Sequence, residues 1–245
     1  MDRRVVQVER GSLRIEQRLR IARVEIGTDA SGPTCIYAVV RVSGGKVRYR
    51  CGSSLVCAPR RFHVFLPPFE IVQASLERCS ATSIALSFRP EASDDLPRQP
   101  VLIPTDDLSV PDSSAEALDK LRRTTAVIPV GRARDPAPLA ATAKAIIDRE
   151  YAGPLEIADV AARLHTSPAV LSRTFRHAYG IPPVRYRHHV RVMDALMQFA
   201  EGALPAAVFQ NVGFDDLSRF YKIFRKVSCA PPGAYRPARS RTAKT

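Results

Sequence analysis

The chain has 245 residues, of which 45% are hydrophobic and 25% charged. This composition is typical of folded globular proteins, excludes a chain that is disordered throughout, and leaves room for two ordinary domains. The sequence has no apolar run near the roughly 18 residues that a membrane helix needs, and its charged beginning lacks the apolar centre of a secretion signal. We therefore expect a cytoplasmic protein that does not enter a membrane.

The charge of the chain is strongly positive. It holds 37 Lys and Arg against 24 Asp and Glu, a formal net charge of +13, and residues 139–245 alone hold 16 against 8. A polyanion such as nucleic acid is the natural partner of such a chain, although a membrane surface or high solubility would also account for the charge.

The five cysteines give no sign of a structural metal or of disulfides. Their number is odd and no two stand in a C-x-x-C pair, so neither a zinc knuckle nor a disulfide framework is indicated. We expect reduced thiols, and no metal or other cofactor. A sensor of thiol oxidation or of a soft metal, built on two of them, stays open as an alternative. The five are Cys35, Cys51, Cys57, Cys79 and Cys229.

Residues 1–90 show the pattern of β structure. Two segments rich in β-branched and alternating residues, 35–42 and 46–51, flank Ser43-Gly44-Gly45, which predicts a hairpin whose turn uses the glycines. Short strands at roughly ten-residue spacing are typical of a small barrel or sandwich. Three further strands are predicted, over 62–66, 71–76 and 82–88.

Residues 91–138 differ in character from the strands before them. Prolines, acidic residues and small residues dominate, and only 115–123 has the pattern of a helix. We interpret this segment as a partly ordered linker.

From residue 139 onward the pattern is helical. Helices are predicted over 139–151 and 155–164, and then over 167–179, where Ser167 followed by Pro168 forms an N-cap and Gly180 a C-cap. Two helices joined by the short turn at 165–166 make a candidate helix-turn-helix motif. Prolines 182 and 183 begin a long helix that ends near residue 201.

The same design recurs about 48 residues later. The pattern Val160-Ala161-x-x-Leu164 is echoed by Val208-Phe209-x-x-Val212, and 171–176 is echoed by 220–225. In the second copy Asp215 or Asp216 can cap the following helix. The sequence therefore predicts two helix-turn-helix motifs, one on each side of the long helix.

These motifs resemble the AraC/XylS family of transcription regulators over about residues 139–237. The resemblance rests on Ile157-Ala158-Asp159-Val160-Ala161, Ser167-Pro168-x-x-Leu171-Ser172-Arg173-x-Phe175-Arg176, Val212-Gly213-Phe214, Phe220-x-x-x-Phe224-Arg225 and Pro232-x-x-Tyr235-Arg236. Three positions depart from the family pattern, and they leave open whether the second motif contacts bases. They are Pro205, Phe209 and Cys229.

The resemblance implies an α+β protein of more than one domain. A small, cupin-like β-barrel or sandwich over 1–90, for effector sensing or dimerisation, would be followed by the linker 91–138. Residues 139–245 would form an all-α DNA-binding domain, with two helix-turn-helix motifs joined by a long helix.

One face of each second helix has the chemistry that DNA requires. Arg173 could donate two of its guanidinium N–H groups to one guanine, and Arg176, almost a turn later, is assigned to phosphate. On the connecting helix, Arg187 and Arg191 are left between phosphate contact and plain solvent exposure. The predicted DNA-binding residues are Ser167, Ala169, Ser172, Arg173, Arg176 and His177, then Leu217, Ser218, Arg219, Tyr221, Lys222, Arg225 and Lys226.

The sequence thus favours a sequence-specific regulator of transcription, expected to activate because the family mostly does. Its expected partners are double-stranded promoter DNA and RNA polymerase, with a small-molecule effector, a protein co-regulator or a second copy of the chain as further possibilities. Candidate effector-binding residues are Tyr37, Tyr49, Cys51 and His63, each of which could instead be an ordinary core position.

Two other functions remain as alternatives. A non-specific, architectural DNA-binding protein would also explain the positive charge. A cupin-like metal enzyme is disfavoured, because His63 is the only histidine before His165 and the chain shows no His-x-His, clustered carboxylates or nucleophile motif.

Overall fold

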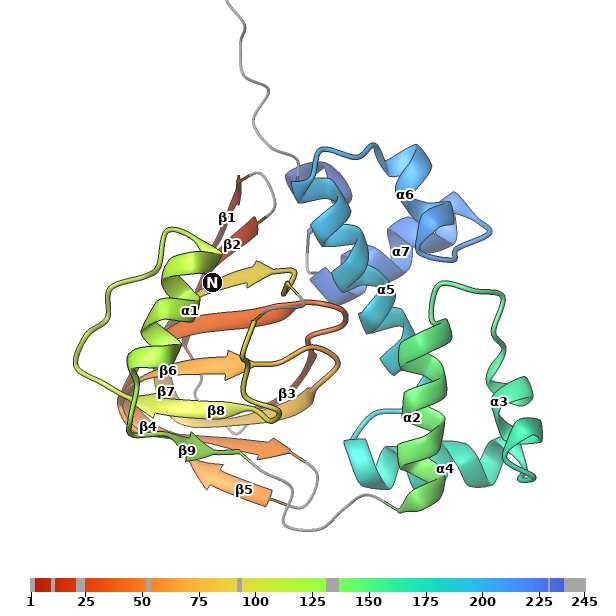
Figure 1. Cartoon of the computed structure of the whole chain (residues 1–245), viewed down its shortest axis with the longest axis horizontal. Coiled ribbons are helices and arrows are strands. Elements are labelled where there is room, and N and C mark those ends of the chain that lie inside the picture. Colours follow the sequence, from red (N-terminus) through yellow and green to blue (C-terminus); the bar gives the residue numbers. More distant parts are fainter. Residues whose placement is uncertain are drawn as a thin grey trace, which may run out of the picture.

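The computed structural model describes residues 3–9, 12–20, 25–51, 54–91, 94–130, 137–228 and 230–235. A curled β-sheet is followed by a helical part, and the long helix α5 lies where the two meet (Figure 1). The strands are β1 (Arg3–Glu9), β2 (Ser12–Arg20), β3 (Glu25–Ala30), β4 (Cys35–Cys51), β5 (Ser54–Cys57), β6 (Arg61–Leu66), β7 (Ile71–Phe88), β8 (Val101–Pro104) and β9 (Ile128–Pro129). The helices are α1 (Ser114–Arg123), α2 (Pro138–Glu150), α3 (Ile157–Arg163), α4 (Pro168–Tyr179), α5 (Pro183–Ala200), α6 (Pro205–Asn211), α7 (Leu217–Ser228) and the 3-10 helix η1 (Pro232–Tyr235).

The strands form one antiparallel sheet in the order β1-β2-β7-β4-β6-β8-β9, with β3 also paired to β7 and β5 to β4. Its centre is the long pair β4 and β7, whose register runs from Cys35 opposite Phe88 to Arg50 opposite Gln73. The sheet curls into a half-barrel, which confirms the predicted small β domain (Figure 1).

The predicted hairpin at Ser43-Gly44-Gly45 is wrong. The chain passes straight through these residues as the middle of β4, and the predicted strands 71–76 and 82–88 are likewise one strand, β7. A Cβ at Gly45 would collide with the backbone oxygen of Glu77, so this glycine allows a close approach between the two strands. Opposite it, Arg78 has a φ of 46°, which marks a local distortion of β7.

Much of the predicted linker packs on the sheet instead. Val101 of β8 pairs with Phe65 of β6, and β9 continues the edge. Leu118 and Leu121 of α1 join a buried cluster with Tyr37 and other sheet residues. The prolines do not prevent this, because an edge strand tolerates a residue that cannot donate a hydrogen bond. The domain boundary at 139 stays a prediction.

The helical part confirms two helix-turn-helix motifs, α3–α4 and α6–α7, joined by α5. The Ser167 hydroxyl accepts from the N–H of Val170 at 3.3 Å, and Gly180 ends α4 with a φ of +79°. In the second motif, Asp216 is the cap, since its carboxylate accepts from the N–H of Arg219. Among the helices of the described residues, none is long and apolar enough to cross a bilayer.

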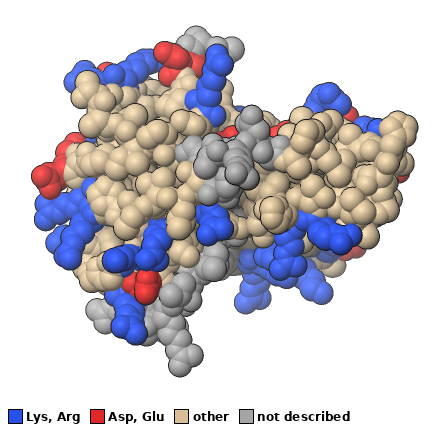
Figure 2. Space-filling view, turned by 90° about the horizontal axis from the view of Figure 1, so that it is seen from below, with Lys and Arg blue, Asp and Glu red and all other residues tan. Residues whose placement is uncertain are grey.

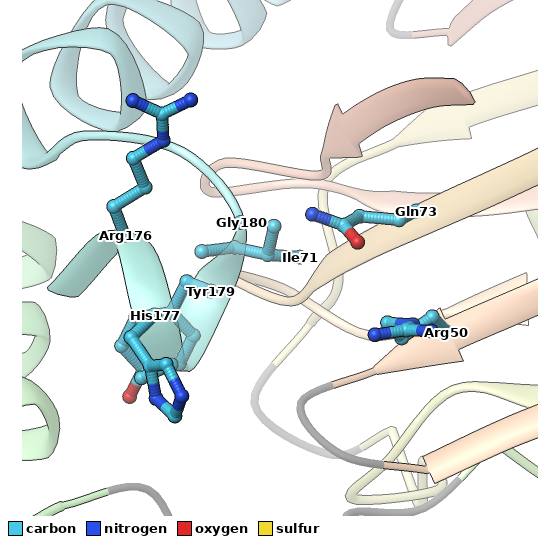
Figure 3. A pocket seen from close by; sticks show the side chains of 8 residues that line it. Arg50, Ile71, Gln73, Arg176, His177, Tyr179 and Gly180 are labelled. Atoms are coloured by element: carbon cyan, nitrogen blue, oxygen red, sulfur yellow. The ribbon is translucent and has the colours of Figure 1, made fainter. Parts of the chain in front are cut away.

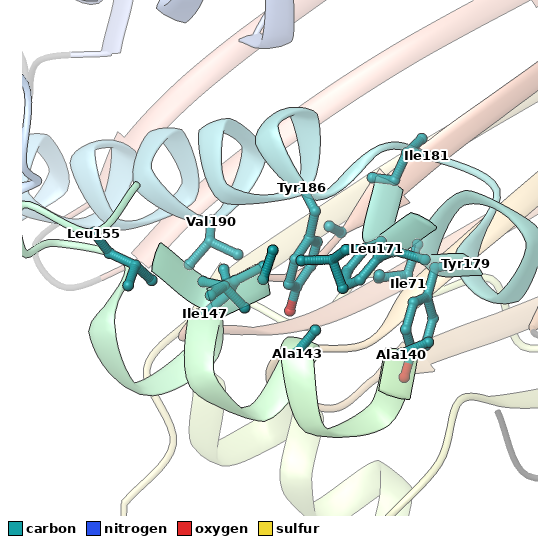
Figure 4. Close-up of a cluster of buried hydrophobic side chains, with 14 residues drawn as sticks. Ile71, Ala140, Ala143, Ile147, Leu155, Leu171, Tyr179, Ile181, Tyr186 and Val190 are labelled. Atoms are coloured by element: carbon teal, nitrogen blue, oxygen red, sulfur yellow. The ribbon is translucent and has the colours of Figure 1, made fainter. Parts of the chain in front are cut away.

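Two buried clusters hold the motifs against α5. The first includes Leu171 and Phe175 of α4 with Tyr186 and Val190 of α5, and it also takes in Ile71 of the sheet (Figure 4). The second groups aromatic side chains of the second motif around α5, namely Phe199, Phe214, Phe220, Phe224 and Tyr235. Because the first cluster contains sheet residues, the sheet and the helical part share a core.

Polar contacts fasten the same junction. Arg89, just after β7, donates to Asp194 at 2.6 Å and to Glu201 at 3.0 Å. Asp194 also accepts from the Tyr151 hydroxyl at 3.0 Å, so one buried carboxylate joins the sheet, the end of α2 and α5. The long helix α5 therefore contacts the sheet, the first motif and the second motif.

Candidate nucleic-acid interface

Helix α4 separates an apolar face from a polar one. Leu171, Phe175 and Tyr179 are buried, while Ala169 and Arg173 are exposed and Ser172 is half-buried. The N-cap Ser167 is also exposed. Among the described residues, Arg173 has no ion pair, so its guanidinium is available to an external acceptor.

Helix α7 has the same construction. Phe220, Phe224 and Ser228 face inward. All seven residues predicted for this motif are exposed, and six of them carry a cationic group or a hydroxyl that can donate hydrogen bonds. The seven are Leu217, Ser218, Arg219, Tyr221, Lys222, Arg225 and Lys226. We define α4 and α7 as the two reader helices.

The end of α4 lies against the sheet. Arg176 and His177 line a pocket of about 300 Å³ together with Arg50 and Gln73, which come from β4 and β7 (Figure 3). The structure thus places Arg176 and His177 nearer the sheet than Arg173, which lies a turn closer to the beginning of α4. The assignment of Arg176 to phosphate stays a prediction.

Positive charge lies on the sheet and also on the helical part (Figure 2). Figure 2 shows Lys and Arg side chains grouped along one edge of its surface with few Asp or Glu among them. Further positive charge lies beneath the surface, on α5. Arg191 donates to the carbonyl oxygens of Tyr151 at 2.6 Å and Gly153 at 3.0 Å. Burial, aided by Arg187 and Arg219, lowers the pKa of Arg191 to about 10.

The four predicted effector residues do not come together. The Tyr37 hydroxyl and Nδ1 of His63 lie 2.5 Å apart in the core beneath α1, and Nε2 of His63 lies 2.7 Å from the carbonyl oxygen of Asp107. Burial lowers the pKa of His63. Cys51 is buried within the sheet's other cluster. Tyr49 lines a cavity.

That cavity, of about 360 Å³, lies between the opposite face of the sheet and the helices α5 and α7. Its walls are mainly aliphatic, and its polar groups include His189, Lys226 and three serines. Burial, together with Arg185, lowers the pKa of His189 to about 4, so this imidazole is neutral at pH 7. The sequence did not predict this cavity, because its walls come from segments more than 180 residues apart.

The model of a helix-turn-helix domain matches residues 160–238. The match covers α4, α5, α6, α7 and η1, and therefore both reader helices. Over 82 residues the chain is 37% identical to the arabinose operon regulatory protein of Salmonella typhimurium, and over 100 residues 32% identical to a putative AraC-like transcription regulator of Streptomyces lividans. Residues 160–238 are a helix-turn-helix domain of the AraC type.

The likeness of the AraC-type domain to these relatives covers only part of each protein. It spans 33% of this chain and 29% of the Salmonella protein, and 40% of this chain and 33% of the Streptomyces protein. Among solved structures, an apo variant of ToxT from Vibrio cholerae superposes over 94% of this chain and 98% of its own, with 14% identity and a TM-score of 0.47. The match to the helix-turn-helix model and to the two regulators confirms the resemblance for the AraC-type domain.

Proposed function

We propose that the protein is a sequence-specific regulator of transcription that binds duplex DNA through both reader helices. The observation that carries the proposal is the repeated construction of α4 and α7, each capped, buried on one side and polar or cationic on the other. A helix of this kind fits the major groove, and two of them on one supporting helix can enter successive turns of the groove. Activation, contact with RNA polymerase and a dimer belong to the proposal only as consequences of the family resemblance.

In this proposal, the exposed face near the beginning of α4 contacts the bases. Arg173 lies in the second turn of α4, on the same exposed face as Ala169 and Ser172, and a helix that enters the groove by its N-terminus brings these residues to base edges. The proposed function is binding, so the test measures affinity and sequence preference.

Arg173→Ala is expected to lower affinity for a specific duplex by about 1–3 kcal/mol and to relax preference at one base position. Binding isotherms on a specific and a scrambled duplex measure both effects. The matched change Arg163→Ala removes an equal charge from α3, where Arg163 pairs with Glu150 at 2.6 Å, and should leave sequence preference intact. Equal losses on both duplexes for Arg173→Ala would contradict its base contact.

A second function is favoured by the cavity between the sheet and α5. Its volume and aliphatic walls suit a small, mainly apolar molecule, and His189 and Lys226 could meet one polar group of that molecule. Since Lys226 and Val227 belong to α7, such a molecule would contact the sheet and the second reader together. The structure-based proposal therefore moves the effector site away from Tyr37 and His63 and keeps Tyr49.

Filling the cavity tests this second function. Ala85→Leu adds bulk to the sheet wall, and we expect it to abolish the rise in melting temperature that small apolar molecules produce in the unmodified chain. The control is Leu55→Ala, which changes an exposed sheet residue outside the cavity. Ala117→Leu would not serve, because Ala117 is fully packed. If small apolar molecules raised the melting temperatures of Ala85→Leu and of the unmodified chain equally, the cavity would not be their binding site.

A further inference from the structure

Arg187 is a buried cation whose hydrogen bonds are incomplete. Its side chain lies on α5, the residue is 8% exposed, and its Nη1 has no hydrogen-bond partner among the described residues. Burial lowers the pKa of Arg187, against the opposing effect of Glu156. Buried polar groups in folded proteins are nearly always paired, because an unpaired donor loses its hydration without compensation. A water molecule or an anion that reached this guanidinium would complete its hydrogen bonds.

The space that Arg187 faces is positively charged. It is a pocket of about 290 Å³ lined also by Arg191 and Arg219, which we call the three-arginine notch. Two carboxylates lie at the same place, but both are engaged. Glu156 caps the backbone at the beginning of α3, and Asp215 lies 3.9 Å from Arg219. Arg191 donates to two carbonyl oxygens, and the exposed side chain of Arg219 meets Asp215 only at 3.9 Å, so Arg187 and Arg219 keep donors for an anion.

The notch opens between the two motifs and away from the sheet. Its walls come from the loop before α3, from the turn before α7 and from the helices α5 and α7, and none comes from a strand. The residues with which α5 faces the sheet-side cavity are different ones, His189, Met193 and Leu196. Arg219 lies in the first turn of α7, the end of a reader helix that approaches DNA.

We propose that the three-arginine notch binds one phosphate of the DNA backbone, at the point where the strand crosses between the groove segments entered by α4 and α7. This inference rests on the proposed function. The phosphate oxygens would accept hydrogen bonds from Arg187 and Arg219, and the bound anion would offset the buried charge of Arg187. The contact positions the duplex without selecting its sequence. Free inorganic phosphate has the same chemistry and can serve as a probe.

The test compares Arg187→Gln with Arg185→Gln in the full chain. Arg185 lies on the same helix but is exposed and lines a different groove, beside Lys222 and Lys226. Binding is measured at several salt concentrations on a specific and a scrambled duplex. We expect Arg187→Gln to reduce the slope of log affinity against log salt by about one unit on both duplexes, as the loss of one phosphate contact requires. Arg185→Gln should reduce it by clearly less.

A second measurement does not depend on DNA. At equal ionic strength, inorganic phosphate should raise the melting temperature of the unmodified chain and of Arg185→Gln above the value in chloride, and this rise should be lost in Arg187→Gln. Arg187→Lys keeps the charge but loses the paired donors, so it should retain most of the salt slope while binding DNA more weakly. This conservative variant also serves as a control in case Arg187→Gln fails to fold.

An unchanged salt slope for Arg187→Gln, or an equal loss in Arg185→Gln, would overturn the DNA contact. A phosphate-dependent rise in melting temperature combined with an unchanged slope would show a site for free phosphate only, which also overturns it. If the unmodified chain bound no duplex while phosphate still acted through Arg187, the proposed function would fail and the notch would remain an anion site of another kind.

Discussion

Replacing Phe220 with alanine is expected to lower the free energy of unfolding by about 3–5 kcal/mol. Phe220 is fully buried, and its ring centroid lies 5.3 Å from that of Phe214, 5.5 Å from Phe224 and 6.5 Å from Phe199. These neighbours belong to α5, α7 and the turn before α7, so the vacated space cannot close without moving the second motif. Denaturant unfolding of the full chain, followed by circular dichroism, measures the loss.

The adjacent Tyr221 supplies the matched control. It is 41% exposed, and Tyr221→Ala should change the free energy of unfolding by about 0.5 kcal/mol or less while weakening DNA binding. Phe220→Ala thus tests the packing that holds α7 in place, and Tyr221→Ala tests the contact of α7 with DNA. If Phe220→Ala were as stable as Tyr221→Ala, the packing described for this cluster would be wrong.

Asp194→Ala is expected to lower the free energy of unfolding by a similar amount, about 3–5 kcal/mol. The carboxylate is buried and accepts from Arg89 at 2.6 Å, from the Tyr151 hydroxyl at 3.0 Å and from Gln198 at 3.3 Å. Alanine would leave these donors without their acceptor at the junction of the sheet with α2 and α5. Because the donors come from different elements, the loss should appear as a lower melting temperature of the whole chain.

Glu201→Ala tests the same junction from its exposed edge. Glu201 also accepts from Arg89, at 3.0 Å, but its side chain is 45% exposed and an ion pair there contributes about 1 kcal/mol at most. The cost of Glu201→Ala should therefore be several-fold smaller. Equal costs for the two variants would show that Asp194 does not hold the junction.

The helical part could be predicted because its signals are local. Ser167 caps the backbone three residues ahead, Gly180 ends the same helix, and Pro183 begins the next, so each feature acts within a few residues of itself. The exposed faces of α4 and α7 follow in the same way from the spacing of apolar residues along each helix. The proposal that both motifs bind DNA came from the family resemblance and not from the spacing of residues.

The sheet and its junction with the helices could not be predicted in this way. Gly45 has the sequence pattern of a turn, and its actual use depends on β7, more than 30 residues away. The apolar residues of 101–104 found partners in β6 despite the neighbouring prolines. Arg89 and Asp194 stand 105 residues apart, so no pattern along the chain joins them.

The candidate site likewise combines features set by one helix with features set by contacts between distant segments. Exposure of Arg173 was predictable from its own helix, whereas the proximity of Arg176 to Arg50 depends on how the sheet docks. The incomplete bonding of Arg187 is likewise a property of three elements together, and the sequence could only leave it between phosphate contact and solvent.

On the proposed function, two reader helices on one supporting helix bind duplex DNA in a sequence-specific way. Hydroxyl-radical footprinting of the full chain, on a duplex selected from a random pool, can show this binding. We expect two protected patches on one face of the duplex, with centres about one helical turn apart, and an affinity at least about 10³ times that for random duplexes. A single patch, or near-uniform affinity for all duplexes, would contradict the claim and would favour a non-specific architectural protein.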